Sequence, residues 1–394
     1  QSVHTSGQPV PESDYAAFVG AHDLHAGGID GEGVTIAVLD SGWWKSHQWL
    51  QNDLTGAWRV KAQYNAIRDS DTHMKDHSGH GSHVASVMLS SRTADSGNTM
   101  AVAPMADFIP VKAFAEDGSG TYLDVIRGID WVVANRDLHD IQILNLSFSA
   151  TPQSFYWDDP LNQAVMAAWQ AGIVVVASAG NSGPDPMSIG VPGNVPYVIT
   201  VGAMTDSYTP EDPSDDRVAS FSAAGPTVEG FVKPDLIAPG GHMIGSMHSE
   251  KHSIAAAHPE FETINHRLFQ MSGTSQSAAV ISGVVALMLQ ADPSLSPDDV
   301  KCRLVSTARA AMGEDGTPAF SIFQQGSGLV DAAAAVSSTT YGCANVNMDI
   351  TAELNGEGHY AGPVNRDEDG NYGIMSEDGE WFVDAPGTVW NGTY

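Results

Sequence analysis

Three histidines stand three residues apart in the stretch HSGHGSHVA, as His77, His80 and His83. Such spacing places side chains near one face of a helix and would allow a metal site. Zinc hydrolase motifs usually carry a glutamate as general base between their histidines, whereas here only Asp76 precedes the cluster. The intervening glycines and serines favour a loop that enters a helix. Metal binding is therefore secondary to proton transfer by one histidine.

Three other polar residues adjoin apolar segments in positions that suit catalysis. Asp40 ends the apolar run GVTIAVLD, where a carboxylate can orient a histidine, coordinate a metal or bind a ribose hydroxyl. The glycines of GEGVTIA precede the strand and lack the third glycine of a dinucleotide fingerprint, which disfavours nucleotide binding. Ser275 precedes an apolar helical pattern, as an ordinary N-cap or as a nucleophile near backbone N–H groups. Asn181 is either a turn residue or an oxyanion donor.

The segments that must position these residues alternate between strand and helix patterns. Buried strands are predicted over residues 33–40, 107–114, 141–148, 172–180 and 197–204. Helices are predicted over residues 123–136, 159–172, 275–291 and 296–309. The alternation predicts an α/β fold, a three-layer open parallel sheet with helices on both faces. Ligands of such folds bind at the carboxyl ends of the strands, which is where Asp40 lies.

The chain order Asp40, His80, Ser275 is one of the known orders of a catalytic triad. In addition, seven short blocks occur in the order of one protease family. They are AVLDSG, GHGSHVA, AVAP, LNLSF, SAGNSG, VKPDLIAPG and SGTSQSAA. Over roughly residues 15–335 the chain resembles the subtilases, the subtilisin-like serine proteases.

This resemblance implies a subtilisin-like fold and a secreted serine endopeptidase of broad specificity that acts through an acyl-enzyme. His80 would be the general base, Asp40 would fix its tautomer, Ser275 would attack the scissile carbonyl and Asn181 would donate to the oxyanion. His83 would be packed in the helix and His77 would lie near the surface. Two alternatives remain open here: a metal-dependent hydrolase that uses the histidine cluster, and a non-catalytic binding protein with a protease fold.

The resemblance also implies where substrate binds, since one family segment pairs in extended form with the substrate backbone. The candidate contacts are Gly118, Gly120, Tyr122, Ser147, Phe148, Ser149, Ser178, Ala179 and Gly180. The chain departs from the family pattern at three positions. Gln276 replaces a methionine, Ala279 replaces a proline, and Ser149 stands where glycine is common and would narrow the cleft.

Metal and cysteine chemistry are implied less directly. Calcium is commonly structural in the family, and the loop at residues 91–100 occupies its usual place, with Asp95 and Asn98 as oxygen donors. Its sequence does not reproduce the family loop. Cys302 and Cys343 either form one disulfide or remain free thiols. The histidine-rich segment 242–270 suggests a surface insertion near the cleft, either a plain exposed loop or a place for a metal.

Charge and length restrict the partners and the location. The chain has 394 residues and 47 acidic against 17 basic side chains, a net charge of −30 that disfavours nucleic acid and anionic membranes. The best apolar stretch, residues 278–291, is too short to span a bilayer. The chain begins at Gln1, which suggests removal of targeting or pro-segments and therefore a zymogen that is exported. We expect a monomer whose partners are protein or peptide substrates.

The composition changes near residue 340. Residues 341–394 contain ten acidic side chains, one arginine, nine glycines and scattered aromatic residues. We therefore predict a catalytic domain over residues 1–340 and an acidic, glycine- and aromatic-rich extension over residues 341–394. The extension would either bind substrate or cover and stabilise the catalytic domain.

Overall fold

The computed structural model describes residues 14–94, 97–209, 213–248, 250–263, 267–313, 316–375 and 381–383. Its main sheet runs in the order β2-β3-β1-β4-β5-β6-β7, and β8 also pairs with β6. These strands are β1 (Thr35–Asp40), β2 (Tyr64–Asn65), β3 (Asp107–Lys112), β4 (Ile141–Leu146), β5 (Val174–Ser178), β6 (Ile199–Thr205), β7 (Arg217–Val218) and β8 (Leu236–Pro239). All neighbours are parallel except β6 and β7. The predicted α/β class is confirmed, with one short antiparallel strand at the edge.

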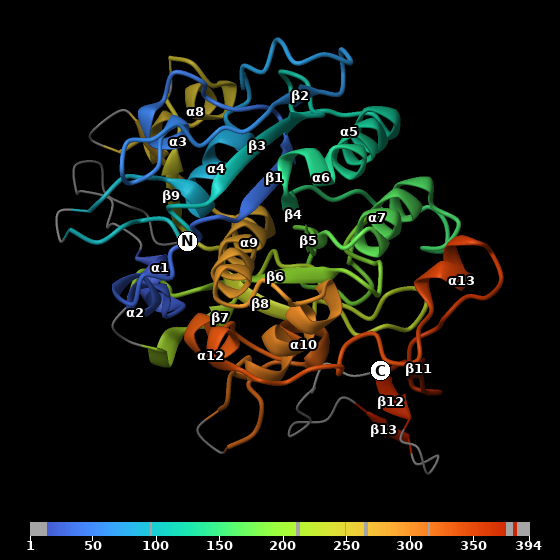
Figure 1. The fold of residues 1–394 in the computed structure, drawn as a ribbon. Coiled ribbons are helices and arrows are strands. Elements are labelled where there is room, and N and C mark those ends of the chain that lie inside the picture. Colours follow the sequence, from blue (N-terminus) through green and yellow to red (C-terminus); the bar gives the residue numbers. More distant parts are fainter. Residues whose placement is uncertain are drawn as a thin grey trace.

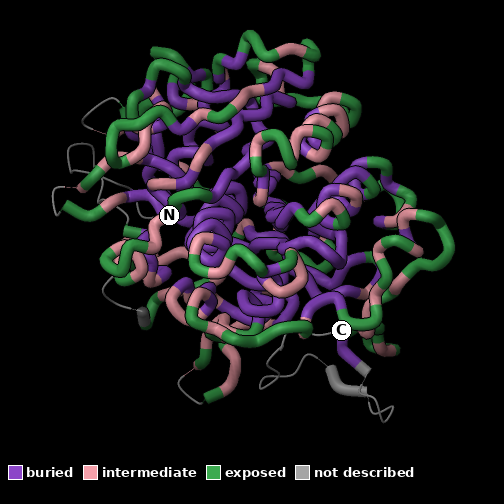
Figure 2. Tube along the Cα trace, in the orientation of Figure 1, coloured by how far each residue is buried: buried purple, intermediate pink, exposed green. Residues whose placement is uncertain are grey.

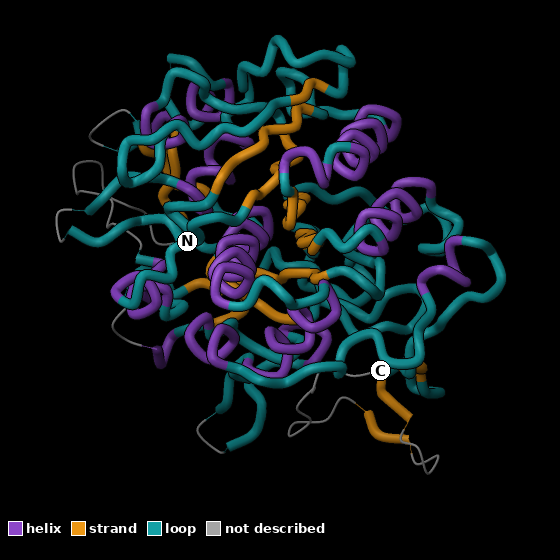
Figure 3. Tube along the Cα trace, viewed as in Figure 1, coloured by secondary structure: helices purple, strands orange, loops and turns teal. Residues whose placement is uncertain are grey.

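Helices cover both faces of this sheet, as Figures 1 and 3 show. The longer helices are α4 (His80–Leu89), α5 (Tyr122–Ala134), α7 (Pro160–Gln170), α9 (Thr274–Ala291) and α10 (Pro297–Thr307). Helices α5 and α7 pack against each other, and α4 packs against α9, which crosses β4, β5, β6 and β8. Ser296 and Asp299 form a capping box at the start of α10 with Pro297 in its first turn, so the predicted start of this helix is confirmed.

The core lies between the sheet and these helices, because the central strands carry apolar residues on both faces. Every residue of β1 is buried, and β5 is buried throughout. Figure 2 shows this buried centre beneath an exposed outer shell. The ends of the five predicted strands lie within two residues of the ends that the structure shows. Asp40 therefore lies at the end of β1 and Ser178 at the end of β5. Both are at the edge of the buried sheet where ligands of such folds bind.

Helix α9 is the one described helix that is long and apolar enough to cross a membrane. It begins at Thr274 and has 18 residues. It is therefore longer than the apolar stretch 278–291 identified in the sequence. Nearly all of it is buried inside the protein, between the sheet and α4. A core helix of this kind passes the same test of length and composition.

Shorter elements complete the fold. The short helices are α1 (Tyr15–Phe18), α2 (Ala21–Ala26), α3 (Gln48–Gln51), α6 (Arg136–His139), α8 (Ser253–Ala257), α11 (Ile322–Gln325), α12 (Ala332–Ser337) and α13 (Ile350–Leu354). Single 3-10 turns are η1 (Pro213–Asp215) and η2 (Pro259–Phe261). Strands β9 (Met243–Ser246) and β10 (Leu268–Met271) form a hairpin, and β11 (Val364–Arg366), β12 (Tyr372–Met375) and β13 (Trp381–Val383) form a small antiparallel sheet.

The residues that follow position 340 are fastened to the rest of the chain by several kinds of contact. A disulfide joins Cys302 of α10 to Cys343, which resolves the choice between bridge and free thiols in favour of the bridge. The buried carboxylate of Glu353 accepts hydrogen bonds from the hydroxyls of Tyr156 at 2.5 Å and Tyr197 at 2.6 Å. Burial raises the pKa of both tyrosines, and the Glu353 carboxylate raises it further, so the hydroxyls remain donors.

Candidate active site

Asp40 and His80 form the best-defined pair of the site. Asp40 ends β1 and His80 begins α4, so one side chain projects from a strand end and the other from a helix start. The Nδ1 atom of His80 lies 2.8 Å from Oδ1 and 2.9 Å from Oδ2 of Asp40, whose exposure is 2%. Since an ionised carboxylate only accepts, Nδ1 carries the proton and donates it. The other ring nitrogen, Nε2, is left with a lone pair that can accept a proton.

A second buried carboxylate, Asp76, supports this pair. Asp76 accepts from the N–H of Gly79 at 2.7 Å, and from the N–H and hydroxyl of Ser82 at 2.8 Å and 2.7 Å. Ser41 contacts both carboxylates, since its hydroxyl lies 2.9 Å from Asp76 and 3.1 Å from Asp40. Asp76 therefore holds the first turn of α4, and with it the backbone of His80, in a fixed place relative to β1.

Charge and burial act in opposite directions on His80. Burial lowers its pKa, but the Asp40 carboxylate and its hydrogen bond raise it, and Asp76 adds to this effect. The net result is a pKa above the ordinary value of a histidine. The two carboxylates favour the imidazolium form of His80. They therefore help His80 to take up a proton during a reaction.

Ser275 lies in the first turn of α9, where the sequence predicted it, and is 7% exposed. Its hydroxyl donates to the carbonyl oxygen of Ser147 at 2.9 Å, and the Ser147 hydroxyl donates back to the Ser275 carbonyl at 2.9 Å. Ser147 lines the same cavity as Asp40 and His80. The Ser275 hydroxyl is therefore hydrogen-bonded to a residue that lines the cavity, and its proton points toward Ser147 in this conformation.

The side-chain oxygen of Asn181 accepts hydrogen bonds that hold the side chain in place, and its Nδ2 group remains as a donor. The N–H and hydroxyl of Thr274 donate to the Asn181 Oδ1 atom at 2.9 Å and 3.0 Å. The N–H of Gly180 in turn donates to the Thr274 hydroxyl at 3.2 Å. These bonds fix the carbonyl and amide ends of Asn181, so its Nδ2 donors lie beside the start of α9, where Ser275 follows Thr274.

The other two histidines of the first motif have different surroundings. The Nε2 atom of His83 donates to the Phe269 carbonyl at 3.0 Å, and the Gln276 amide lies 3.3 Å from its Nδ1 atom. Burial lowers the pKa of His83 to about 4, so it is neutral and packed. The Nε2 atom of His77 lies 3.3 Å from Glu116 near the surface. Among the described residues no three His, Cys, Asp or Glu side chains gather into a metal cluster.

A cavity of about 250 Å³ lies at this end of the sheet. It brings together Asp40 and His80 with three of the predicted substrate contacts, namely Gly118, Ser147 and Phe148. The rings of Phe148 and Phe114 pack 5.2 Å apart along its wall. The remaining lining residues are Ser41, Ser78, Asp117, Ser253 and Ile254.

The other predicted substrate contacts lie outside this cavity. The Tyr122 hydroxyl donates to Asp159 on α7 at 3.1 Å, so this side chain faces a helix N-cap. Gly120 packs against Phe114, whose ring would lie 2.5 Å from an added Cβ. Ser178 donates its hydroxyl to the Phe148 carbonyl at 2.9 Å, and Ala179 is fully buried.

Ser149 faces two glycines rather than the 250 Å³ cavity. A Cβ added at Gly180 would lie 2.7 Å from the Ser149 hydroxyl oxygen, and one added at Gly190 would lie 2.2 Å from it. Gly180 also has φ +110, which favours glycine. The Ser149 hydroxyl therefore occupies space beside residues 178–180 that a glycine at this position would leave open.

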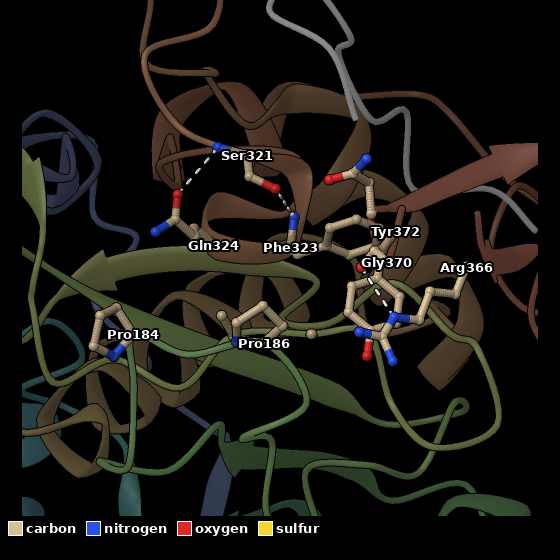
Figure 4. Close-up of a pocket in the computed structure, with 11 residues that line it drawn as sticks. Pro184, Pro186, Ser321, Phe323, Gln324, Arg366, Gly370 and Tyr372 are labelled. Carbon is tan, nitrogen blue, oxygen red and sulfur yellow. Dashed lines mark hydrogen bonds between the residues drawn. The ribbon is translucent and has the colours of Figure 1, made fainter. Parts of the chain in front are cut away.

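A larger cavity, about 630 Å³, lies between the loop that carries Pro184 and Pro186 and the small sheet of β11 and β12 (Figure 4). Its wall includes Pro184, Pro186, Phe323, Arg366 and Tyr372. The Arg366 guanidinium lies 5.6 Å from the Tyr372 ring centroid and donates to the Gly370 carbonyl. None of the candidate catalytic residues lines this cavity, so its size does not make it the active site.

The predicted calcium ligands receive no support from the described residues. Asp95 lies outside them, and Asn98 is exposed, with its backbone carbonyl accepting from the Ala94 N–H at 2.8 Å. Of the two predicted ligands the structure therefore describes only Asn98, and among the described residues no three His, Cys, Asp or Glu side chains gather there.

Sequence reasoning missed several residues that build the site. Ser41 and Asp76 could have been found from their positions beside Asp40 and shortly before His80. Lys112, which donates to the carbonyls of Ser41 and Lys75, ends β3 beside them. Ser253 and Ile254 come from the histidine-rich segment, for which the sequence suggested a plain loop or a metal site.

Comparison with known proteins gives consistent matches. Residues 31–341 match the family model described as the subtilase family. The chain is 40% identical over 278 residues to serine protease AprX of Bacillus subtilis (strain 168), covering 69% of this chain and 60% of that protein. It thus spans less than two thirds of that relative. It is 30% identical over 320 residues to subtilisin DY of Bacillus licheniformis, covering 81% of this chain and 96% of that protein.

The structure also resembles a solved one. The crystal structure of a cold adapted subtilisin-like serine proteinase aligns with a TM-score of 0.54 at 28% identity. The alignment covers 73% of this chain and 86% of the other. The agreement therefore extends from short motifs to the arrangement of strands and helices.

Proposed function

This chain belongs to the subtilase family of subtilisin-like serine peptidases, and we propose that it is an endopeptidase that cleaves protein substrates through an acyl-enzyme. The observation that carries the proposal is the bond of Asp40 to Nδ1 of His80 beside a cavity to which Ser275 is attached. An orienting carboxylate, a base with a free Nε2 and a serine at a helix start are the parts of nucleophilic acyl transfer.

The proposed reaction begins when the Ser275 hydroxyl rotates away from the Ser147 carbonyl. Its oxygen attacks the scissile carbonyl carbon while its proton passes to Nε2 of His80. Asp40 keeps the remaining ring proton on Nδ1 and stabilises the imidazolium. His80 then gives its proton to the leaving amine as the C–N bond breaks. Water repeats the sequence on the ester, which releases the acid and restores Ser275.

The negative oxygen that forms during attack needs donors that are already in place. The Nδ2 group of Asn181 supplies one, because Thr274 holds the other end of the amide. The dipole at the start of α9 favours the negative charge as well. In subtilisin, loss of the equivalent side-chain donor costs about 10² to 10³ in turnover, a magnitude that we adopt for Asn181.

We further propose that substrates bind in extended form beside residues 117–120, with the residue before the cut directed toward residues 178–180. Main-chain pairing makes few demands on sequence, which favours broad specificity. The Ser149 hydroxyl narrows the space beside Gly180 and Gly190. Large side chains at that substrate position should therefore be accepted less readily than in a Ser149→Gly variant.

Three broader proposals concern location, organisation and calcium. The Cys302–Cys343 bridge supports export, since disulfides persist in oxidising compartments. Residues 341–375 would act as a cover that is tied to the catalytic domain by this bridge and by Glu353. A structural calcium remains a prediction for which Asn98 is the one expected ligand among the described residues, and a rise of the melting temperature in calcium over chelator would support it.

The test of the proposed function compares two neighbouring serines of α9. Ser275→Ala should abolish casein hydrolysis while the far-ultraviolet circular dichroism spectrum stays unchanged. Ser277→Ala is the matched control, because the Ser277 hydroxyl is also buried but only donates to the Ala238 carbonyl at 3.0 Å. Retention of activity in Ser275→Ala would contradict the proposal.

A further inference from the structure

The connection between β9 and β10 reaches back to the catalytic histidine. We call residues 250–263 of this connection the cleft segment; they contain α8 and η2. The N–H groups of Ser253 and Ile254 donate to the carbonyls of His77 and Ser78 at 2.8 Å and 3.2 Å. The segment is thus hydrogen-bonded to the loop that leads directly into His80.

Side-chain packing holds the cleft segment in that place. Ala255 is fully buried against Met247 and Phe269, with Ile254 packed on the same cluster. His252 is 2% exposed and its ring centroid lies 5.2 Å from that of Trp44. A Cβ added at Gly79 would lie only 2.8 Å from the Cβ of His252. Buried His252 and Ala255 therefore anchor the segment beside the cleft, although most of its other residues are exposed.

Ser253 and Ile254 complete the wall of the 250 Å³ cavity beside His80. The cavity's larger apolar side chains are Phe114, Phe148 and Ile254. Its two carboxylates are already engaged. Asp40 accepts from His80, and Asp117 accepts from the N–H and hydroxyl of Ser119 at 2.9 Å and 2.6 Å. The cavity therefore offers the apolar surface of Phe114, Phe148 and Ile254 to an apolar side chain of the substrate.

The alternation of side chains along an extended substrate determines which substrate residue enters this cavity. Successive side chains of an extended peptide point to opposite sides. If the residue before the cut points toward residues 178–180, the preceding residue points the other way, toward His80 and Ile254. The substrate position that meets the cavity is therefore the second before the cut.

We propose that Ile254 is a specificity-determining residue that closes this cavity and selects apolar side chains at the second position before the cut. The inference rests on the proposed endopeptidase function. Differential contact with one apolar side chain is worth about 10-fold or more in kcat/KM, so the selection should be measurable.

The experiment digests a denatured mixture of proteins and maps the cleavage sites by mass spectrometry. For the wild-type enzyme, Leu, Ile, Val and Met should be enriched about 10-fold over Lys, Arg, Asp and Glu at the second position, relative to their abundance. In Ile254→Ala this enrichment should fall to less than about twofold, while cleavage after glycine at that position continues. Ile254→Val should retain most of the enrichment.

Phe261→Ala is the matched control, since Phe261 is 43% exposed on the same segment and does not line the cavity. It should leave the enrichment unchanged. The inference is overturned if the wild type shows no apolar enrichment, if basic residues are enriched instead, or if Ile254→Ala keeps the wild-type pattern. Absence of any cleavage by the wild type would instead refute the proposed function on which the inference rests.

Discussion

Opening the Cys302–Cys343 bridge should destabilise the protein by about 4 kcal/mol. The bridge closes a loop with a sequence separation of 41. Cross-linking removes conformational freedom from the unfolded chain, which is worth about 3 kcal/mol for a 15-residue loop and about 4.7 kcal/mol for a 100-residue loop. A loop of intermediate length gives about 4 kcal/mol, which is a factor of roughly 10³ in the unfolding equilibrium.

The assay is guanidinium unfolding of the double variant Cys302→Ala/Cys343→Ala, followed by tryptophan fluorescence. Both enzymes should carry Ser275→Ala so that self-digestion does not distort the curves. Dithiothreitol should lower the free energy of unfolding of the bridged protein and leave that of the double variant unchanged. A loss below about 1 kcal/mol, or an equal effect of reductant on both proteins, would refute the loop-closure reasoning.

Three more predictions concern buried titratable groups. Glu353→Ala leaves two buried tyrosine hydroxyls without their acceptor and should cost about 3 kcal/mol in urea unfolding, whereas Glu357→Ala, at an exposed position, should be neutral. Asp76→Asn removes a charge that raises the pKa of His80, so the acid limb of kcat/KM should move to lower pH. His83 has a folded pKa of about 4, below its unfolded value. The contribution of His83 to the free energy of unfolding is therefore present above about pH 6.5 and is lost as pH falls toward 4, by up to about 1.4 kcal/mol per pH unit. His83→Gln should make the free energy of unfolding less dependent on pH in this range.

Each of these predictions has a contrary outcome. Equal stability of the two glutamate variants would mean that the extension is not held by its buried carboxylate. An unmoved acid limb in Asp76→Asn would mean that the rate does not report the His80 titration. An unchanged slope of stability against pH in His83→Gln would mean that this ring is already protonated in the folded protein.

The strands and the Asp40–His80 pair could be predicted because they depend on local patterns and residue types. Runs such as residues 33–40 are apolar on both faces, which is typical of a central parallel strand. The order Asp40, His80, Ser275 and the glycines around them are readable in the sequence without coordinates. The structure brings Asp40 and His80 together at the strand end where the pattern indicated them.

The features that sequence reasoning missed depend on long-range packing. The Ser147 carbonyl accepts from Ser275, but a backbone oxygen has no residue-type signature. The Tyr122 hydroxyl donates to Asp159, a bond that the sequence did not indicate and that forms because α5 and α7 lie side by side. Ile254 reaches the cleft only because its segment, far from His80 in the sequence, folds back onto the loop before that residue. Gln276, a departure from the family pattern, becomes a polar partner of His83.

The central claim is that Ser275 is the nucleophile activated by His80, and covalent labelling tests it most directly. The active enzyme is treated with a fluorophosphonate, and the labelled residue is identified by peptide mass spectrometry. We expect one adduct, on Ser275, which forms in step with the loss of casein hydrolysis and is absent from His80→Ala. Full inactivation with the adduct on another residue, or undiminished labelling of Ser275 in His80→Ala, would contradict it.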